Sequence, residues 1–319
     1  MFNNARIFLL SFLSVFFSNC KKDPPIILPN ECANFSYTSA NVQNWPGNDT
    51  NYYVPCFNPN NSNEIIYGKG IISGKTSYIV KRNLLTKSET NIVSNWLRKP
   101  DWSRKDWIVF NHSDNQVWKV KSNGDSLTLL TKDMLGGHNA VWSPDGNRIA
   151  FIREGNAKYY TIIADMDGNH LDTLPYFSFY LSKWSSNGLF IAALSNDYVN
   201  VNYFDVSSRK LFTPTNNFLN DHATNLVFSD AIAWTPDSQY LIWANQQGIY
   251  KTNIITNVTQ KIKAACDAKY YTSLSVSPDG NKMIAARVDQ RFDGKNLYIK
   301  TGLSLMNIDG TNENMIETR

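Results

Sequence analysis

The sequence lacks the pattern that would predict helices. After Phe17, no long segment repeats its apolar residues at the 3.6-residue period of an amphipathic helix. The longest mainly apolar run, IFLLSFLSVFF, has 11 residues and ends at Phe17, whereas a membrane-spanning helix needs about 20. The 4 cysteines include no CxxC pair, and the 4 histidines show no zinc-type spacing with them. These absences argue against a helical fold, a transmembrane span and a structural zinc site of the common kind.

Catalytic signatures are also missing from the sequence. It contains no GxSxG elbow, no HExxH motif and no complete P-loop. GKGIISGKTS at Gly68–Ser77 ends like a P-loop, but its glycines are one residue too close, so we expect a glycine-rich hairpin loop. DQRFDGKN at Asp289–Asn296 predicts a long, charged surface loop rather than a pair of catalytic carboxylates. We therefore expect no catalytic residue and no cofactor.

The charge is nearly balanced. The 31 basic and 27 acidic side chains give a net charge of +4 and form no long runs. Nucleic-acid binding usually needs a clustered basic patch or stripe, so we expect no nucleic-acid partner. With 42% hydrophobic and 13% aromatic residues, the chain can instead build a sizeable core.

The N-terminus has the features of an export signal. Arg6 precedes the apolar run, Cys20 follows it in SNC, and KKDPP comes next. This order resembles a bacterial lipoprotein signal, with residues 1–19 as signal peptide and Cys20 as the lipidated first residue of the mature chain. Asn19 departs from the small residue usual before that cysteine, and an ordinary signal peptide cleaved nearby is the alternative. The lysines and the aspartate after Cys20 also resemble the surface-export signal of Bacteroidetes lipoproteins.

Cysteine use is compatible with export. If Cys20 is acylated, Cys32, Cys56 and Cys266 remain, which is an odd number for an oxidising compartment. We expect one disulfide and one free thiol. Cys32 and Cys56 are closest in sequence, but the pairing stays open.

One ten-residue pattern occurs three times in the chain. It reads WSPDGNRIAF at Trp142–Phe151, WTPDSQYLIW at Trp234–Trp243 and VSPDGNKMIA at Val276–Ala285. Three degenerate copies begin at the aromatic residues Phe57, Trp102 and Trp184. The six first residues, which we call the anchors, are 45, 40, 42, 50 and 42 residues apart. A fixed period of this length indicates a repeat architecture.

Each repeat has the content of a four-stranded antiparallel sheet. SPDG suits a tight turn, because Pro fixes φ at its second position and Gly allows positive φ at its fourth. Apolar strands flank this turn, and two more follow before the next anchor. Six such units predict an all-β fold, a six-bladed β-propeller spanning 55–319, in which the anchors pack in the core. ENMIETR supplies the last strand, and residues 20–54 form a tether and an extension lying against the first or last blade.

WSPDG followed by an apolar strand, an aromatic-containing strand and a DG turn resembles the TolB-type, WD40-like propeller repeat. The resemblance covers nearly the whole chain after Val54 and implies a fold rather than a function, because such propellers serve binders, peptidase accessory domains and polysaccharide lyases. TolB carries an α/β domain before its propeller, and we expect a propeller-only relative here. The TolB family docks a peptidoglycan-associated lipoprotein, which suggests a similar partner.

Strand order assigns the loops to two faces. Connections between units and second-to-third strand loops share one face, which should carry His112, His138 and His222, while His170 should lie on the other. The candidate partner-binding residues are therefore His112, His138, Asn139, Asp221 and His222. As a metal site, His112, His138 and His222 are the weaker alternative, since imidazole suits zinc, manganese or iron.

Two functions from different classes follow. The first is a non-catalytic, lipid-anchored envelope propeller that binds a protein or cell-envelope component through this face, at the outer membrane and on either its periplasmic or its surface side. The second is a metal-dependent polysaccharide lyase or another hydrolytic or lytic enzyme with the histidines at the channel mouth. The identity of the partner and the oligomeric state stay open at this stage.

Overall fold

All elements of the described structure are β-strands. The computed structural model describes residues 40–316, except 133–136, 156–157, 175–179, 196–197 and 216–225. The chain divides into two compact units, Met1–Glu31 and Cys32–Arg319, and the described residues all belong to the second. They contain no helix, and so none that could span a membrane. The expectation of an all-β chain is confirmed.

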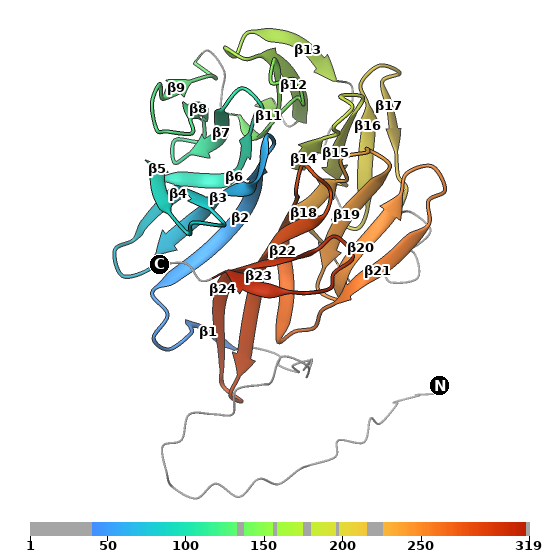
Figure 1. Cartoon of the computed structure of the whole chain (residues 1–319). Helices are drawn as coiled ribbons and strands as arrows, with labels where there is room; N and C mark the ends of the chain where they lie inside the picture. Colours follow the sequence, from blue (N-terminus) through green and yellow to red (C-terminus); the bar gives the residue numbers. More distant parts are fainter. Residues whose placement is uncertain are drawn as a thin grey trace, which may run out of the picture. The chain divides into compact units, whose positions relative to one another are not determined.

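Four of the sheets are four-stranded, antiparallel blades, each built from consecutive strands (Figure 1). The first contains β2 (Thr50–Asn58), β3 (Asn61–Ile71), β4 (Thr76–Asn83) and β5 (Glu89–Ser94). The second contains β6 (Trp96–Trp102), β7 (Trp107–His112), β8 (Val117–Lys121) and β9 (Thr128–Leu129). The third contains β10 (His138–Trp142), β11 (Arg148–Gly155), β12 (Lys158–Asp165) and β13 (His170–Leu174). The fourth contains β14 (Tyr180–Trp184), β15 (Phe190–Leu194), β16 (Val201–Asp205) and β17 (Lys210–Phe212).

The remaining strands form one nine-stranded sheet. One part contains β18 (Val227–Trp234), β19 (Tyr240–Asn245), β20 (Gly248–Asn253) and β21 (Thr259–Ala264). The other contains β22 (Lys269–Val276), β23 (Lys282–Phe292), β24 (Asn296–Asn307) and β25 (Asn314–Ile316), with β1 (Asn41–Asn44) on β24. A single parallel pairing, Asp230 with Ser273, joins the two parts. Four of the six predicted four-stranded sheets are therefore present as separate sheets. The strands of the other two form the single nine-stranded sheet.

The first strand of each unit lies innermost, and these strands form a closed ring. β2 contacts β6, β6 contacts β10, β10 contacts β14, β14 contacts β18, β18 contacts β22, and β22 contacts β2. The ring closes as expected without a strand exchanged from the N-terminus, because β25 completes the last unit on β24. β1 instead extends that unit, where Lys300 Nζ lies 4.6 Å from the ring centre of Trp45. β1, from the segment expected to lie against the first or last blade, thus pairs with a strand of the last unit.

The anchors stand at or beside the ends of the innermost strands, where they pack between units. Five are nearly buried, and their exposed fractions are 4% for Phe57, 2% for Trp102, 3% for Trp142, 3% for Trp184 and 5% for Trp234. Val276 is partly buried against the same kind of apolar cluster. Stacking of neighbouring sheets thus removes from water the apolar surface that a single blade would expose.

The repeated turn satisfies its own polar groups. Ser143 Oγ donates to Asp145 Oδ1 (2.5 Å) and accepts from the backbone N–H of Arg148 (2.9 Å), while Gly146 takes φ of 68°. The same hydroxyl-to-carboxylate bond recurs between Ser277 and Asp279. The motif is repeated because each copy closes the hairpin between the first two strands of its unit.

Two loop predictions have different outcomes. Gly68–Ser77 is a hairpin as expected, with only residues 72–75 between β3 and β4. Asp289–Asn296 is not a long loop, because β23 continues to Phe292 and β24 begins at Asn296. The charged side chains of this stretch alternate along a long antiparallel pair instead, a pattern compatible with a strand that has one solvated face.

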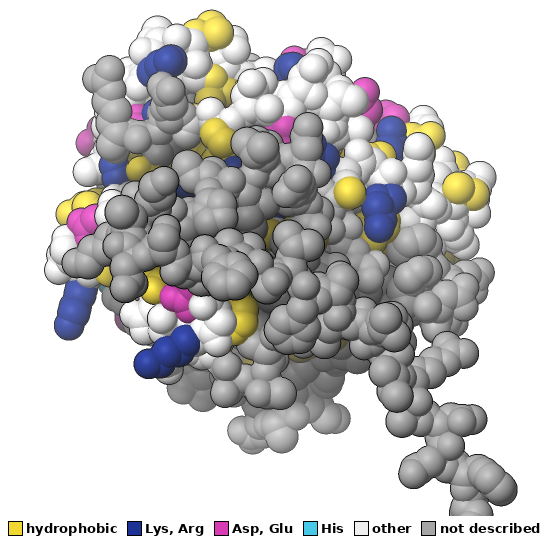
Figure 2. Space-filling view, turned by 90° about the horizontal axis from the view of Figure 1, so that it is seen from below, with side chains coloured by type: hydrophobic (Ala, Val, Ile, Leu, Met, Phe, Trp, Pro, Cys, Tyr) yellow, Lys and Arg dark blue, Asp and Glu magenta, His cyan; other side chains and the backbone are white. Residues whose placement is uncertain are grey.

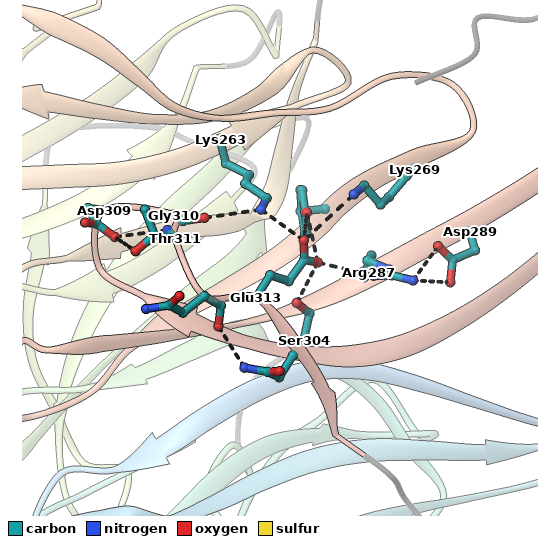
Figure 3. Close-up of polar contacts among 12 residues, drawn as sticks. Lys263, Lys269, Arg287, Asp289, Ser304, Asp309, Gly310, Thr311 and Glu313 are labelled. Carbon is teal, nitrogen blue, oxygen red and sulfur yellow. Dashed lines mark hydrogen bonds and ion pairs between the residues drawn. The ribbon is translucent and has the colours of Figure 1, made fainter. Parts of the chain in front are cut away.

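The last unit is stabilised by a largely shielded carboxylate between β24 and β25. Glu313 accepts from Ser304 Oγ (2.8 Å) and pairs with Lys263 Nζ (3.1 Å) and Arg287 (3.3 Å), so that groups from β21, β23 and β24 converge on it (Figure 3). Tyr271 of β22 adds its hydroxyl at 3.0 Å. Burial acts to raise the pKa of Glu313, but the hydrogen bonds from Ser304 and Lys263 outweigh it and hold the pKa at about 2.

Candidate functional site: the central channel

The innermost strands surround a channel with a cavity toward each end. At the end where these strands begin, the cavity is lined by Trp96, Asn139 and Tyr180, and at the end where they finish it is lined by the anchors. We call these ends the connection face and the turn face, because sheet-to-sheet connections lead into the first and the SPDG-type turns leave the second.

The connection-face cavity is open and has aromatic walls. Its volume is about 490 Å³. Tyr53, Trp96 and Tyr180 contribute aromatic rings, Asn139 a buried amide and Lys99 an ammonium group. Tyr53 and Trp96 also pack on each other, with ring centres 6.2 Å apart. Such amphipathic rings bring large contact area at low entropic cost, which suits recognition of another molecule.

The turn-face cavity is smaller, about 150 Å³, and draws on all six innermost strands. Phe57, Trp102, Trp142, Trp184 and Trp234 form its aromatic wall. Prolines of the repeated turns stand around it, namely Pro59, Pro144, Pro236 and Pro278. The anchors therefore have a second role besides packing between units, because they shape the wall of this end of the channel.

A polar cluster lies in the wall of this cavity. Lys183 Nζ pairs with Asp101 Oδ1 and lies 3.9 Å from Cys56 Sγ, while Cys56 Sγ lies 3.7 Å from the same carboxylate oxygen. Asp101 also accepts from the backbone N–H of Trp142 through Oδ2 (2.7 Å). Its side chain is 1% exposed, so its charge depends on these partners.

The register of the repeats explains why these residues meet. Cys56, Asp101 and Lys183 each stand directly before an anchor, at the position that Val141 and Ala233 occupy in other units. Sequence reasoning missed this cluster because it examined histidines and turns. The available signal was the presence of two charged residues at a strand position that Val141 and Ala233 occupy in other copies.

The cluster does not activate its thiol. Burial raises the pKa of Cys56, and the nearby ammonium of Lys183 only partly opposes this effect, so the thiolate is disfavoured at neutral pH. Burial acts to lower the pKa of Lys183, but the carboxylate of Asp101 outweighs it and raises that pKa above its ordinary range. The three groups are therefore arranged as a charge pair beside a neutral thiol, rather than as a nucleophile with a base.

The cysteines divide as the odd count suggested. Cys56 is a free, buried thiol, whereas Cys266 is disulfide-bonded. Of the pairings that the sequence left open, those that include Cys56 are therefore excluded. Cys20 and Cys32 lie outside the described residues.

Lys99 lines both cavities and so lies between the two ends of the channel. It is 8% exposed, and its Nζ donates to the backbone carbonyl of Asp230 at 3.2 Å. Burial lowers the pKa of Lys99, although the charge of Asp230 acts in the opposite direction. Lys99 therefore lies between the two cavities with a carbonyl, not a carboxylate, as its hydrogen-bond acceptor.

Three of the sequence-predicted site residues lie at the connection face. His112 ends β7 and packs on Trp118, and its Nδ1 lies 3.6 Å from Asp114 Oδ2. His138 begins β10 and makes an edge contact with Tyr159. Asn139 is buried with φ of 53°, and its backbone N–H donates to Asn111 Oδ1 at 3.0 Å. Asn139 is the one of the three that lines the cavity.

The remaining predicted residues, Asp221 and His222, lie outside the described residues. Within the described ranges, no three His, Cys, Asp or Glu side chains are grouped so that they could hold a metal ion. The proposed trio of His112, His138 and His222 includes a residue outside those ranges, so this part of the chain does not decide it. In the view of Figure 2, the visible lysine and arginine side chains are scattered rather than gathered in one patch.

The fold and the channel define the class of protein: a β-propeller of four-stranded antiparallel blades. Among solved structures, the chain is similar to one assigned as TolB from Agrobacterium tumefaciens, with 16% identity, a TM-score of 0.59, and coverage of 73% of this chain and 86% of that one. It is also similar to TolB from Acinetobacter baumannii, with 14% identity and a TM-score of 0.58, covering 83% of this chain and 63% of that protein's length. No family model matches the sequence, and no curated protein matches it either. The predicted TolB-like propeller fold is confirmed.

Proposed function

We propose that this chain is a non-catalytic envelope protein that binds a protein or cell-envelope component at the connection face. The observation that carries the proposal is the cavity of Tyr53, Trp96, Tyr180 and Asn139 at that face. Tyrosine and tryptophan dominate the energetics of protein interfaces, because their rings exclude water over a large area and keep a polar edge. Asn139 is also a residue chosen for this role from the sequence alone.

The proposed binding surface joins this cavity to its neighbours on the same face. It comprises His112, His138 and Asn139, with Asp221 and His222 from the connection before β18. The structural likeness to TolB supports a propeller on which such a surface can form. A peptidoglycan-associated lipoprotein is the first partner to test, by analogy with the TolB family.

We propose six blades, with the nine-stranded sheet counted as two that touch through the Asp230 and Ser273 pairing. The six innermost strands that close the ring support this count. The proposed parts are a signal peptide at 1–19, a tether and extension at 20–54 and the propeller at 55–319. The last boundary falls within β2, which begins at Thr50, so the first strand extends into the segment assigned to the extension.

The proposed location is the outer membrane, reached by export and held there by a lipid on Cys20. Its basis is the order of Arg6, the apolar run and Cys20, as in bacterial lipoproteins. Protease accessibility in intact cells distinguishes a periplasmic from a cell-surface orientation.

The test of the binding surface replaces histidines on opposite faces. The double variant His138→Ala, His222→Ala should bind a peptidoglycan-associated lipoprotein, or a partner purified with the wild type from envelope extract, at least about tenfold more weakly. Its melting temperature should stay near that of the wild type, because His138 is only half-buried. His170→Ala is the matched control, since His170 is exposed beside the turns of the other face and should leave affinity unchanged. The proposal would be contradicted if the double variant and His170→Ala lost affinity equally, or if neither variant lost affinity.

A further inference from the structure

The turn-face cavity carries basic side chains, two of which, Arg104 and Lys183, are not among the residues that line the connection-face cavity. Lys99, Arg104 and Lys183 line it, and no acidic residue is among the described residues that line it. Asp101 lies behind the wall and neutralises Lys183. Of the other two basic groups, Lys99 is buried and lies within the influence of the charge of Asp230, and Arg104 is exposed at the rim, where it can meet an anion.

The hydrogen bonding of Lys99 indicates that an anion in the cavity would approach its ammonium group. Its Nζ donates to the uncharged carbonyl of Asp230, whereas Lys183 pairs directly with a carboxylate. An ammonium group presents three donors, and burial makes a charged acceptor far more favourable than it would be in water. Because Lys99 also lines the cavity, a ligand bound there would lie close to this side chain.

The size and walls of the cavity limit the rest of the ligand. A volume of about 150 Å³ matches that of apolar cavities that hold a benzene-sized molecule. Trp102, Trp142, Trp184 and Trp234 supply flat apolar walls. A peptide or an oligosaccharide is too large for a space of this volume. An inorganic anion would fit, but it has no apolar surface to pack against the indole rings.

We propose that the turn-face end of the channel is a binding site for a small organic carboxylate with a compact aromatic or branched apolar body. The carboxylate approaches Lys99 with support from Arg104, and the apolar body packs among the anchor tryptophans. Among the described lining residues only Lys99 is shared with the connection-face cavity, whereas Arg104 lines the turn-face cavity alone. Arg104→Gln therefore tests this proposal independently of partner binding at the connection face.

Benzoate is a suitable probe, and benzyl alcohol is its uncharged match. Isothermal titration calorimetry at constant ionic strength should show saturable binding of benzoate, with benzyl alcohol at least about tenfold weaker. Lys99→Met keeps the length of the side chain and removes the charge, so it should abolish the preference for benzoate. Inorganic phosphate should bind more weakly than benzoate, because it lacks the apolar body.

Arg104→Gln and Lys105→Gln form a matched pair on one turn. Arg104 lines the cavity, whereas Lys105 is exposed beside it and donates to Asn147 Oδ1 instead. We expect Arg104→Gln to weaken benzoate binding several-fold and Lys105→Gln to leave it unchanged, and both should remain folded because both side chains are exposed. The proposal is overturned if benzoate shows no saturable binding, if benzyl alcohol binds equally well, or if neither Lys99→Met nor Arg104→Gln weakens benzoate. Should Lys99→Met fail to fold, the Arg104 pair decides.

Discussion

At the scale of single residues, the fourth position of the repeated turn is under conformational rather than chemical constraint. φ is 68° at Gly146, 75° at Gly188 and 74° at Gly280, and two of the copies that lack glycine keep the same region, with 58° at Ser238 and 63° at Asp106. A Cβ placed on Gly146 would meet the Lys105 side chain at 3.1 Å, a flexible neighbour that can move. The backbone conformation, not the space, therefore sets the cost of a substitution.

Replacement of Gly146 by valine should lower the free energy of unfolding by about 1–3 kcal/mol, because a β-branched residue is strained at positive φ. Urea denaturation followed by fluorescence measures this loss. Gly146→Asn is the control and should cost clearly less, since asparagine tolerates this region. Affinity for a partner at the connection face should barely change in the folded fraction of either variant. If Gly146→Val instead abolished binding without a loss of stability, the two faces would be assigned the wrong way round.

At the scale of elements, β25 shows how a short strand is held. It has three residues and pairs only with β24, yet Glu313 beside it ties together β21, β22, β23 and β24. The side chain of Glu313 is 11% exposed, so its pairing is shielded from solvent more than a surface ion pair would be.

The stabilisation by Glu313 should depend on pH in a defined direction. Its folded pKa of about 2 lies below the ordinary value of 4.5, so the stabilisation is complete above pH 4.5 and is lost as pH falls toward 2. The shift corresponds to roughly 3 kcal/mol. Chemical denaturation at several pH values should show that Glu313→Gln is less stable than the wild type at pH 7 and that the difference shrinks below pH 4.5. A difference that stayed constant down to pH 3 would show that the carboxylate charge does not stabilise this unit.

At the scale of the whole molecule, closure of the propeller ring does not depend on attachment to a membrane. The ring closes through β22 against β2, with Phe57 N–H donating to Ser275 Oγ at 3.1 Å, and this closure needs no residue before β2. Attachment to a membrane would depend on the segment that includes Cys20. Loss of attachment should therefore leave the propeller folded.

Replacing Cys20 by alanine tests that separation. The variant should leave the membrane fraction, because acyl chains supply most of the attachment at about 0.8 kcal/mol per buried CH₂. Its circular dichroism should keep the strand signal of the wild-type protein. A variant that stays in the membrane pellet after a carbonate or high-salt wash would show that the lipoprotein assignment is wrong.

The site could be predicted from the sequence only in part. Strand order placed His112 and His138 on one face, because the direction of an antiparallel strand follows from its place in the unit. The cluster of Cys56, Asp101 and Lys183 was not predicted, since these residues belong to three different units and meet only where the innermost strands converge on the channel.

By itself, the sequence determined the strand content, the repeated turn and the burial of the anchors. These features depend on local backbone preference and on the period of the apolar residues, both of which are written along the chain. The tertiary structure alone decided that the last two units share one sheet, that β23 and β24 extend as a long hairpin, and that Lys99 lies between two cavities. Those outcomes depend on distances between residues far apart in the chain, and closing the ring is what sets those distances.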